Sequence, residues 1–487
     1  MTQDKGVTFS AHETEHRVGL RELERRVAAD LALIAHPQMQ WLVPRKDTHG
    51  HEALDVLIVG AGQSGLAVAF GLMRSRVDNI LVVDCAPYGR EGPWLTYARM
   101  DTLRSPKDYT GPDLDIPSLT YQSWHIAKYG AKSWSDLDLI PRGHWADYLL
   151  WVRQMTNAPV RNDTDVTDIS PSNGLLAVQV KNAAGKSVQL FARKVVLATG
   201  QDGTGHWWMP DEISALPERF RAHAADMIEF ESLRGKTIAV LGTGASAFDN
   251  AAVALERGAA AVTLFCRRER PQVIQPYRWL TFRGFLRHLS DLDDKWRWRF
   301  MRHILALREG FPQATYDRCA CHDNFRLLAG APWTSVRLAN DQVEISTPKG
   351  FHRTDFIICG TGVEMDYSRR PELHNFADNI ASWSDRYEPP TEERDDRLGR
   401  FPYLDEDFAF IEKTEGLTPW IKDIHLFAIG STMSFGPSGS SINAMTTIVP
   451  KLVAAITKGL FRADVESHWS SLQAYDEPQA IVPEEEQ

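Results

Sequence analysis

Val56-Leu57-Ile58-Val59-Gly60-Ala61-Gly62-Gln63-Ser64-Gly65 is the stretch that decides the fold of this chain. Its four leading apolar residues predict a buried parallel strand. Gly60 permits a tight turn after that strand, Gly62 lets the backbone approach a pyrophosphate, and Gly65 lets the next helix pack closely. The N–H groups at the N-terminus of that helix, which begins near Gln63 and Ser64, are suited to binding phosphates. The stretch therefore predicts a dinucleotide-binding turn.

A second apolar run, Ile80-Leu81-Val82-Val83, ends in Asp84. A carboxylate roughly 20 residues after the glycines accepts hydrogen bonds from the ribose hydroxyls of a bound dinucleotide. Strand, turn, helix, strand and acid in this order are much more specific than glycines alone. We therefore expect residues 56–84 to hold one dinucleotide, with Asp84 on its ribose.

A second glycine turn, Gly242-Thr243-Gly244-Ala245-Ser246-Ala247, follows the apolar run 237–241. Ala247 stands where the third glycine is usual, a replacement that this motif tolerates. The next apolar run, 262–265, ends in Cys266-Arg267-Arg268 rather than in an acid. Because arginines suit a ribose 2′-phosphate, this pattern predicts NADPH rather than NADH. The alternative is that Arg267 and Arg268 form a solvated basic edge.

Each glycine turn is followed, at a similar distance, by a β-hairpin and a further apolar strand. The first pair is a hairpin at 175–191 and a strand at 195–200, and the second pair is a hairpin at 342–350 and a strand at 356–362. This repeat predicts an α/β fold with two Rossmann-like dinucleotide-binding domains, the second inserted in the first. We divide the chain into an N-terminal helical arm (1–50), the first domain (51–203), the second domain (204–351, with a helical insert at 270–330) and the remainder of the first domain with the C-terminal tail (352–487).

Three further elements complete this plan. Residues 20–35 carry apolar residues at helical spacing and predict one amphipathic helix in the arm. The closing strand of the first domain is predicted at 424–430. A helix is expected from about Ser441 onward, after a glycine-rich loop at 436–440.

Composition indicates an enzyme of the cell interior. The chain has 487 residues, 43% hydrophobic and 24% charged, and a net charge of -10, which gives no sign of nucleic-acid or acidic-lipid binding. Five scattered cysteines argue for a reducing compartment, so we expect a cytoplasmic protein. The apolar window 54–73 is interrupted by the glycine turn, so we predict no membrane span there. The spacing of Cys319-Ala320-Cys321-His322 does not suit a zinc site, and we predict no metal.

These features resemble the class B, single-component flavin-dependent monooxygenases, which include flavin-containing monooxygenases, amine N-hydroxylases and Baeyer–Villiger enzymes. The resemblance rests on both glycine turns, on Ala198-Thr199-Gly200, and on Gly92-Pro93-Trp94, which is similar to the family's Gly-Gly-x-Trp. It implies FAD on the first turn, NADPH on the second, and O₂ and a small molecule as substrates. It leaves a homo-oligomer open. The residues implied to bind FAD are Gly60, Gly62, Gln63, Ser64, Gly65, Asp84, Trp94, Thr199, Gly200 and Gly430, and those implied to bind NADPH are Gly242, Thr243, Gly244, Ala245, Ser246, Arg267 and Arg268.

The chain also departs from these families. The usual Phe-x-Gly-x-x-x-His signature is reduced to Phe220-Arg221-Ala222-His223, and segment 102–108 lacks the asparagine of the flavin-containing monooxygenases. Lys107-Asp108 with Pro117-Ser118-Leu119-Thr120-Tyr121 is instead similar to a region of the amine N-hydroxylases. That likeness implies that Lys107 contacts substrate or NADPH and is the candidate catalytic residue. The alternative is a solvated loop lysine.

The sequence therefore favours an NADPH- and O₂-dependent FAD monooxygenase that oxygenates a small molecule at nitrogen or sulfur. The alternatives are a Baeyer–Villiger monooxygenase, an NADPH-dependent flavin reductase of the disulfide-reductase fold, and a non-enzymatic nucleotide-binding sensor. The reductase would need a reactive cysteine pair, and the sequence shows none.

Overall fold

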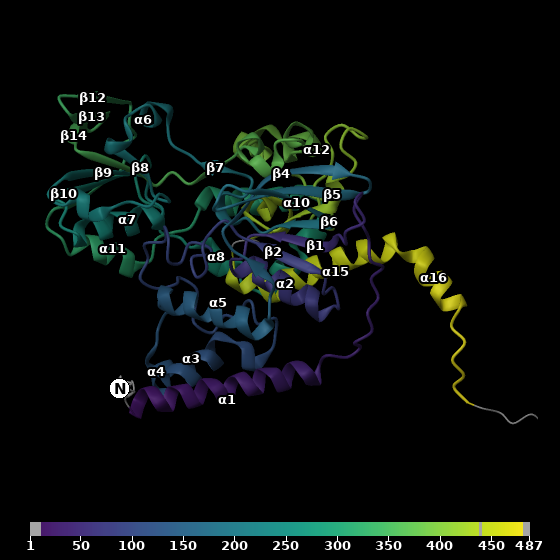
Figure 1. The fold of residues 1–487 in the computed structure, drawn as a ribbon. Helices are drawn as coiled ribbons and strands as arrows, with labels where there is room; N and C mark the ends of the chain where they lie inside the picture. Colours follow the sequence, from purple (N-terminus) through teal and green to yellow (C-terminus); the bar gives the residue numbers. More distant parts are fainter. Residues whose placement is uncertain (1–10, 438–440, 481–487) are drawn as a thin grey trace, which may run out of the picture.

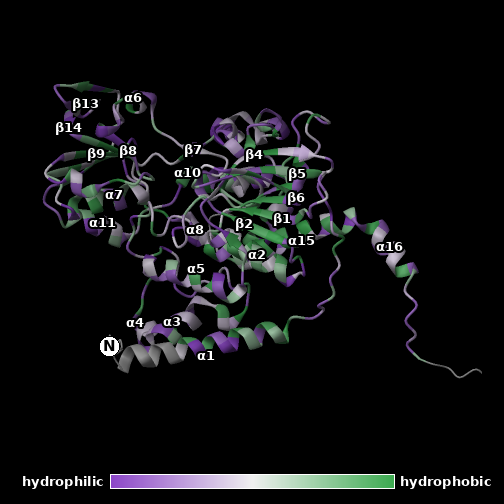
Figure 2. Cartoon of the chain, viewed as in Figure 1, coloured by the Kyte–Doolittle hydropathy of each residue, from purple (hydrophilic) through white to green (hydrophobic). Residues whose placement is uncertain are grey.

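The computed structural model of the chain describes residues 11–437 and 441–480. It contains two domains that lie next to each other, each built on a largely parallel sheet (Figure 1). The buried strands of the first domain are strongly hydrophobic, as Figure 2 shows for β1 and β2. The predicted pair of Rossmann-like domains is therefore confirmed.

The first domain has a seven-stranded sheet in the order β3-β2-β1-β6-β5-β4, with β17 paired to β6. The strands are β1 (Leu54–Val59), β2 (Ile80–Val83), β3 (Val160–Arg161), β4 (Thr164–Ser172), β5 (Leu175–Asn182), β6 (Ser187–Leu197) and β17 (Ile424–Leu426). The long strand β6 pairs antiparallel with β5 and, further along, parallel with β1 and β17. The second arm of the predicted hairpin and the strand after it are thus one continuous strand.

Helices surround this sheet, some packed on its strands and others on neighbouring helices. They are α2 (Gln63–Arg74), α3 (Tyr121–Tyr129), α4 (Ala131–Asp136), α5 (Arg142–Thr156), α14 (Thr432–Phe435) and α15 (Met445–Ala463), followed by α16 (Val465–Gln473). Helix α15 packs on α2, and the segment 442–463 is long and apolar enough to cross a membrane although half of it is buried in the protein. Burial against α2 accounts for its apolar composition.

The N-terminal arm forms one helix, α1 (Ala11–Leu33), which begins earlier than predicted. Helix α1 packs along α3 of its own chain (Figure 1). A Cβ on Gly19 would meet the carbonyl oxygen of Ala127 at 2.5 Å, so the two helices approach very closely there. The arm therefore covers the first domain of the same chain.

The second domain has a five-stranded parallel sheet in the order β11-β10-β9-β15-β8. Its elements are α6 (Asp211–Ser214), β8 (Arg221–His223), β9 (Thr237–Leu241), α7 (Ala245–Glu256), β10 (Ala261–Phe265), α11 (Gln313–Ala320), β11 (Phe325–Leu328), the antiparallel β12 (Ser335–Ala339), β13 (Gln342–Thr347) and β14 (Gly350–Thr354), and β15 (Phe356–Cys359). The antiparallel pair β7 (Gly205–Trp207) and β16 (Val363–Met365) carries the chain into this domain and back. Because β15 pairs with β9, the sheet extends beyond residue 351, where the sequence analysis ended the domain.

The insert at 270–330 differs from the expectation that it belongs to the second domain. Its helices are α8 (Pro276–Trp279), α9 (Arg283–His288) and α10 (Asp294–Leu307); α9 contacts α15, α10 contacts α14, and α8 packs on α10. Phe285, Trp298 and Met301 are buried in the same hydrophobic core as the first sheet. Trp298 also donates a hydrogen bond to the carbonyl of Glu393, in a segment with the short helices α12 (Trp383–Arg386) and α13 (Asp396–Gly399). Of the helices in the insert, α11 is the one that packs on α7 of the second domain. The other helices of the insert cover the first domain.

Candidate cofactor site and domain junction

The first glycine turn joins β1 to α2, as predicted. Gly60 has φ +104°, and a Cβ there would overlap the carbonyl oxygen of Ala198, so Thr199 and Gly200 lie directly beside the turn. The carboxylate of Asp84 accepts hydrogen bonds from the backbone N–H of Ala61 (2.6 Å) and from that of Ala86. Burial raises the pKa of Asp84 above its ordinary value although these N–H groups lower it. The structure therefore brings these four sequence-predicted residues to one edge of the sheet.

The Gly92-Pro93-Trp94 loop lies against the same turn. A pocket is lined there by Gly62, Glu91, Trp94 and Arg153, among others. The indole N–H of Trp94 is buried and has no hydrogen-bond partner within residues 11–437 and 441–480. Gln63 next to it accepts a hydrogen bond from the indole of Trp145 at 3.3 Å. The arrangement leaves a buried donor and an open helix N-terminus facing one pocket.

Sequence reasoning missed two charged residues of this pocket. Arg153 on α5 donates to Glu91 at 2.9 Å, and Asn162 donates to the same carboxylate at 2.7 Å. No local motif marks these residues, because they come from separate segments and meet only through the packing of α5 against the loop.

The return strand brings Gly430 to the first domain's sheet edge. Gly430 follows β17, and a Cβ on it would overlap the side chain of Thr204. The loop predicted at 436–440 includes residues 438–440, which lie outside the described residues. Helix α15 begins at Met445, after a short 3-10 turn at Ile442–Ala444, and so later than expected.

The second glycine turn joins β9 to α7. Gly242 has φ +111°, and a Cβ there would meet the carbonyl oxygen of Gly360 at 2.5 Å. A Cβ on Gly360 would in turn meet the Cβ of Ala247 at 2.6 Å. Gly360, directly after the neighbouring strand β15, thus makes room for Ala247, which stands at the motif's third glycine. Gly244 caps α7 without a side chain and has no heavy atom within 4 Å of its Cβ position, so space for a phosphate group is present.

The predicted arginines lie after β10. Arg267 and Arg268 are both exposed, and Arg268 donates to the carbonyl of Ala306 at 2.7 Å. Arg308, which the sequence analysis did not single out, lies close to them; part of its side chain is exposed, while its guanidinium is packed among protein atoms. Burial of its charge, together with the positive charges of Arg397, Arg267 and Arg268, lowers the pKa of Arg308 to about 10. Such a concentration of cations is suited to a bound anion.

Lys107 lies in a different setting from the one its resemblance implied. Its ammonium donates hydrogen bonds to the carbonyls of Trp134 (2.8 Å) and Leu137, and lies 4.8 Å from the centre of the Trp134 ring. These carbonyls are at the C-terminal end of α4, where a cation is favourable. Direct contact of Lys107 with substrate therefore stays a prediction that nothing here tests.

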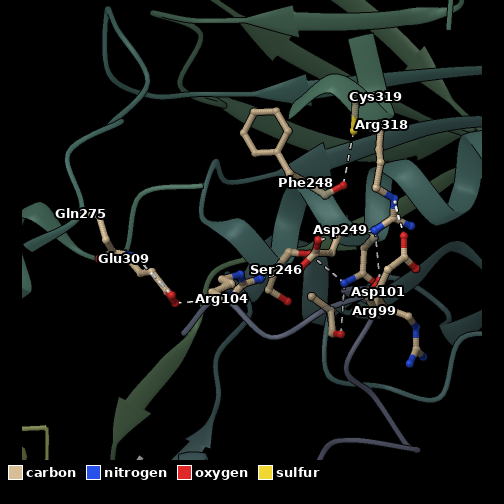
Figure 3. Close-up of polar contacts among 12 residues, drawn as sticks. Arg99, Asp101, Arg104, Ser246, Phe248, Asp249, Gln275, Glu309, Arg318 and Cys319 are labelled. Carbon is tan, nitrogen blue, oxygen red and sulfur yellow. Dashed lines mark hydrogen bonds and ion pairs between the residues drawn. The ribbon is translucent and has the colours of Figure 1, made fainter. Parts of the chain in front are cut away.

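The junction between the domains contains a cluster of ion pairs that sequence reasoning missed (Figure 3). Arg104 contacts Asp249 at 2.5 Å and Glu309 at 3.3 Å, and Arg318 contacts Asp101 at 3.3 Å and Glu256 at 2.9 Å. The only sequence signal was that segment 102–108 departs from the flavin-containing monooxygenase pattern. The cluster ties the segment after the Trp94 loop to helices α7 and α11.

The residues present fit both dinucleotides. For FAD, the first turn offers an uncapped helix, a pocket and the unpartnered indole N–H of Trp94. For NADPH, the second turn offers the open space at Gly244 and the arginines that follow β10. A flavoprotein with two dinucleotide sites, in which a nicotinamide reduces a flavin, is the class that this fold and site define.

Comparison with protein families agrees with this class. A model of FAD- and NAD(P)-binding proteins matches residues 57–202. A model of L-lysine 6-monooxygenases and L-ornithine 5-monooxygenases matches residues 134–277.

One curated relative spans nearly the whole chain. The FAD-dependent urate hydroxylase of Xanthomonas campestris pv. campestris is 38% identical over 465 residues, which cover 95% of this chain and 98% of the relative. The chain therefore belongs to the class B flavin-dependent monooxygenase family: it is an NADPH- and O₂-dependent FAD monooxygenase that acts on a small molecule.

Solved structures show the same fold at lower identity. The ornithine N-hydroxylase of Kutzneria sp. 744, solved with reduced FAD, NADP⁺ and L-ornithine, has a TM-score of 0.64 at 17% identity and covers 84% of this chain and 99% of its own. The L-lysine 6-monooxygenase of Pseudomonas syringae has a TM-score of 0.62 at 20% identity, with the same two coverages.

Proposed function

We propose that this monooxygenase hydroxylates urate or a closely related oxopurine. The observation that carries the proposal is the 38% identity with a urate hydroxylase over 95% of the chain. The amine N-hydroxylases share the fold at 16–20% identity, a level that supports architecture rather than substrate. In this structure the ammonium of Lys107 donates to two backbone carbonyls of its own domain, a contact that does not require an amino-acid substrate.

The chain's own residues bind, orient and enclose the reactants in this proposal. When bound, FAD reduced by NADPH supplies the activation of O₂, from which one oxygen atom goes to the substrate and the other leaves as water. The first turn and Trp94 hold the flavin dinucleotide, and the second turn with Arg267 and Arg268 holds the nicotinamide dinucleotide. The insert helices α9 and α10 close the first domain from the side of α14 and α15 and so help to exclude water.

Oxygenation of an amine nitrogen is the second candidate, as the sequence analysis favoured nitrogen or sulfur. The match of residues 134–277 to lysine and ornithine monooxygenases supports it. Sulfur oxygenation and carbonyl insertion have no observation of their own in this structure.

A substrate panel under ¹⁸O₂ tests the proposal. The purified holoenzyme is supplied with NADPH and, in turn, urate, xanthine, L-ornithine, L-lysine, cadaverine, a thioether, a ketone and a disulfide, and products are analysed by mass spectrometry. We expect one ¹⁸O atom in a urate product and NADPH consumption matched to that product. Labelled hydroxylamine with no urate turnover would replace the proposal by the amine candidate. Reduction of a disulfide without label in any product would contradict both.

We further infer a cytoplasmic enzyme with neither nucleic acid nor a membrane as partner, and we leave a homo-oligomer open. The acidic net charge and the cysteines support the inference. All five cysteines are free thiols, and burial raises the pKa of Cys319 and Cys359 to about 12. Such thiols are poor nucleophiles, which argues against the disulfide-reductase alternative. Fractionation of cells that express the tagged protein tests the location.

A further inference from the structure

Arg104 contacts two separate parts of the molecule with one guanidinium group and joins both to its own segment. It stands in the first domain, in the segment that follows the Trp94 loop. One nitrogen donates to Asp249 on α7 of the second domain, and another donates to Glu309, which follows α10 of the insert (Figure 3). Glu309 also accepts a hydrogen bond from Gln275 at the start of the insert. Arg104 therefore links its segment of the first domain to helix α7 of the second domain and to the insert.

Asp249 transmits this contact to the NADPH turn. It lies on α7 one helical turn after the Gly244–Ser246 segment, and only 2% of its side chain is exposed. A buried carboxylate needs a cationic partner, because desolvation of an isolated charge is very unfavourable. Since α7 is a rigid helix that begins at the turn, the position of Asp249 fixes the position of the helix N-terminus.

A second contact crosses the junction in the opposite direction. Arg318 on α11 of the second domain contacts Asp101 of the first domain at 3.3 Å and donates to the carbonyl of Arg99. Its guanidinium also lies 3.8 Å from the second oxygen of Asp249. Two ion pairs from different helices restrain the rotation of the second domain as well as its distance from the first.

We propose that Arg104, through Asp249, is the positioning residue that holds the NADPH turn on α7 at the distance and angle from the first domain that hydride transfer to the flavin requires. This role goes beyond the proposed function and holds whichever substrate is oxygenated. The step concerned moves a hydride from NADPH to the oxidised flavin and leaves NADP⁺. Small errors in donor–acceptor geometry slow such steps steeply, so a lost contact distant from the reacting atoms has a large kinetic effect.

Anaerobic stopped-flow reduction of the holoenzyme tests this role. We expect Arg104→Gln and Asp249→Asn to lower the rate of flavin reduction at saturating NADPH at least about tenfold, while the Kd for NADPH changes less than about threefold. Because the two residues act through one contact, the double variant should be no slower than the slower single variant. Arg104→Lys, which can engage only one carboxylate, should recover part of the rate. The matched control is Arg257→Gln, which removes an exposed ion pair with Glu231 in the same domain and should leave the rate unchanged.

A second readout does not depend on activity. In the FAD-bound protein without NADPH, amide hydrogen exchange of residues 101–108 should be faster in Arg104→Gln than in the wild type. The same exchange should be unchanged in Arg257→Gln. A reduction rate within twofold of wild type in both Arg104→Gln and Asp249→Asn would overturn the proposal, even if both variants melt earlier. Should Arg104→Gln lose FAD on purification, Arg104→Lys and Asp249→Asn, which preserve side-chain volume, decide by the same criteria.

Discussion

The ammonium of Lys107 lies 2.8 Å from the carbonyl oxygen of Trp134 and 4.8 Å from the centre of the same residue's ring. Lys107 therefore satisfies the C-terminal carbonyls of α4 and fixes the segment that carries Arg104.

Lys107→Ala should impair coupling through this segment. We expect the loss of charged hydrogen bonds to lower the free energy of unfolding by about 1–2 kcal/mol and to raise the yield of peroxide relative to oxygenated product. The KM for the organic substrate should change little, because the ammonium already has protein partners. The peroxide yield and the substrate KM are both measured in one assay that follows peroxide and oxygenated product. A large rise in substrate KM with normal coupling would instead identify Lys107 as a substrate contact.

Gly62→Val should give a folded but colourless protein. Gly62 has φ −66°, and the nearest heavy atom to its Cβ position is 3.9 Å away, so a valine side chain is compatible with the fold. The same side chain would stand where the backbone approaches the pyrophosphate. The flavin absorbance of the purified protein and its circular dichroism measure the two effects separately. Full FAD content in Gly62→Val would disprove the assignment of the first turn.

Gly244→Val is the counterpart on the second turn. Its Cβ position is also free of neighbours, so the variant should fold and remain yellow. We expect NADPH to reduce its flavin very slowly, whereas dithionite reduces it as in the wild type, because only the nicotinamide dinucleotide is excluded. Normal reduction by NADPH would show that this turn binds something else.

The contrast between the glycine turns and the domain junction shows what sequence can and cannot predict here. Each glycine turn is a local signal in which strand, turn and helix follow within a few residues, so both were found, together with the β-hairpins. Arg104 and Asp249 are 145 positions apart and meet only because the two domains pack against each other.

The helical insert was misassigned for a related reason. The sequence indicated a helical insert at 270–330, but not that side chains such as Trp298 pack in the core of the first domain. Gly360 was read only as the end of a strand, although its missing Cβ is what allows Ala247 at the second turn. Such relationships depend on tertiary packing and leave no local pattern.

Replacement of Arg267 by Gln should weaken NADPH binding selectively. A lost contact to a phosphate is worth about 1.5–3 kcal/mol, or roughly ten- to hundredfold in KM, and NADH lacks that phosphate. Arg308→Gln should act in the same direction, because its guanidinium belongs to the same group of cations. Arg268→Gln should have a smaller effect, since this side chain is bonded to the carbonyl of Ala306. Steady-state KM values for NADPH and NADH measure the difference, and equal changes for both would leave these arginines as surface charges.

His425 on β17 should make the fold sensitive to mild acid. It is buried, its Nδ1 lies 2.8 Å from the carbonyl oxygen of Asp407, and burial together with the charge of Lys194 lowers its pKa to about 4. The unfolded chain has a histidine pKa of about 6.5 and therefore binds a proton more readily than the folded chain between these values. The stability that neutral His425 contributes is thus fully present above pH about 6.5 and is lost as the pH falls towards about 4. We expect His425 to lower the free energy of unfolding by about 2 kcal/mol between pH 7.5 and pH 5.

Urea unfolding of the wild type and His425→Gln at both pH values measures this contribution, because the variant cannot titrate at position 425. The comparison also cancels the contribution of Asp405, whose pKa burial raises to about 6. If the stability difference between wild type and His425→Gln is the same at pH 7.5 and pH 5, folding does not lower the pKa of His425 and the prediction is wrong.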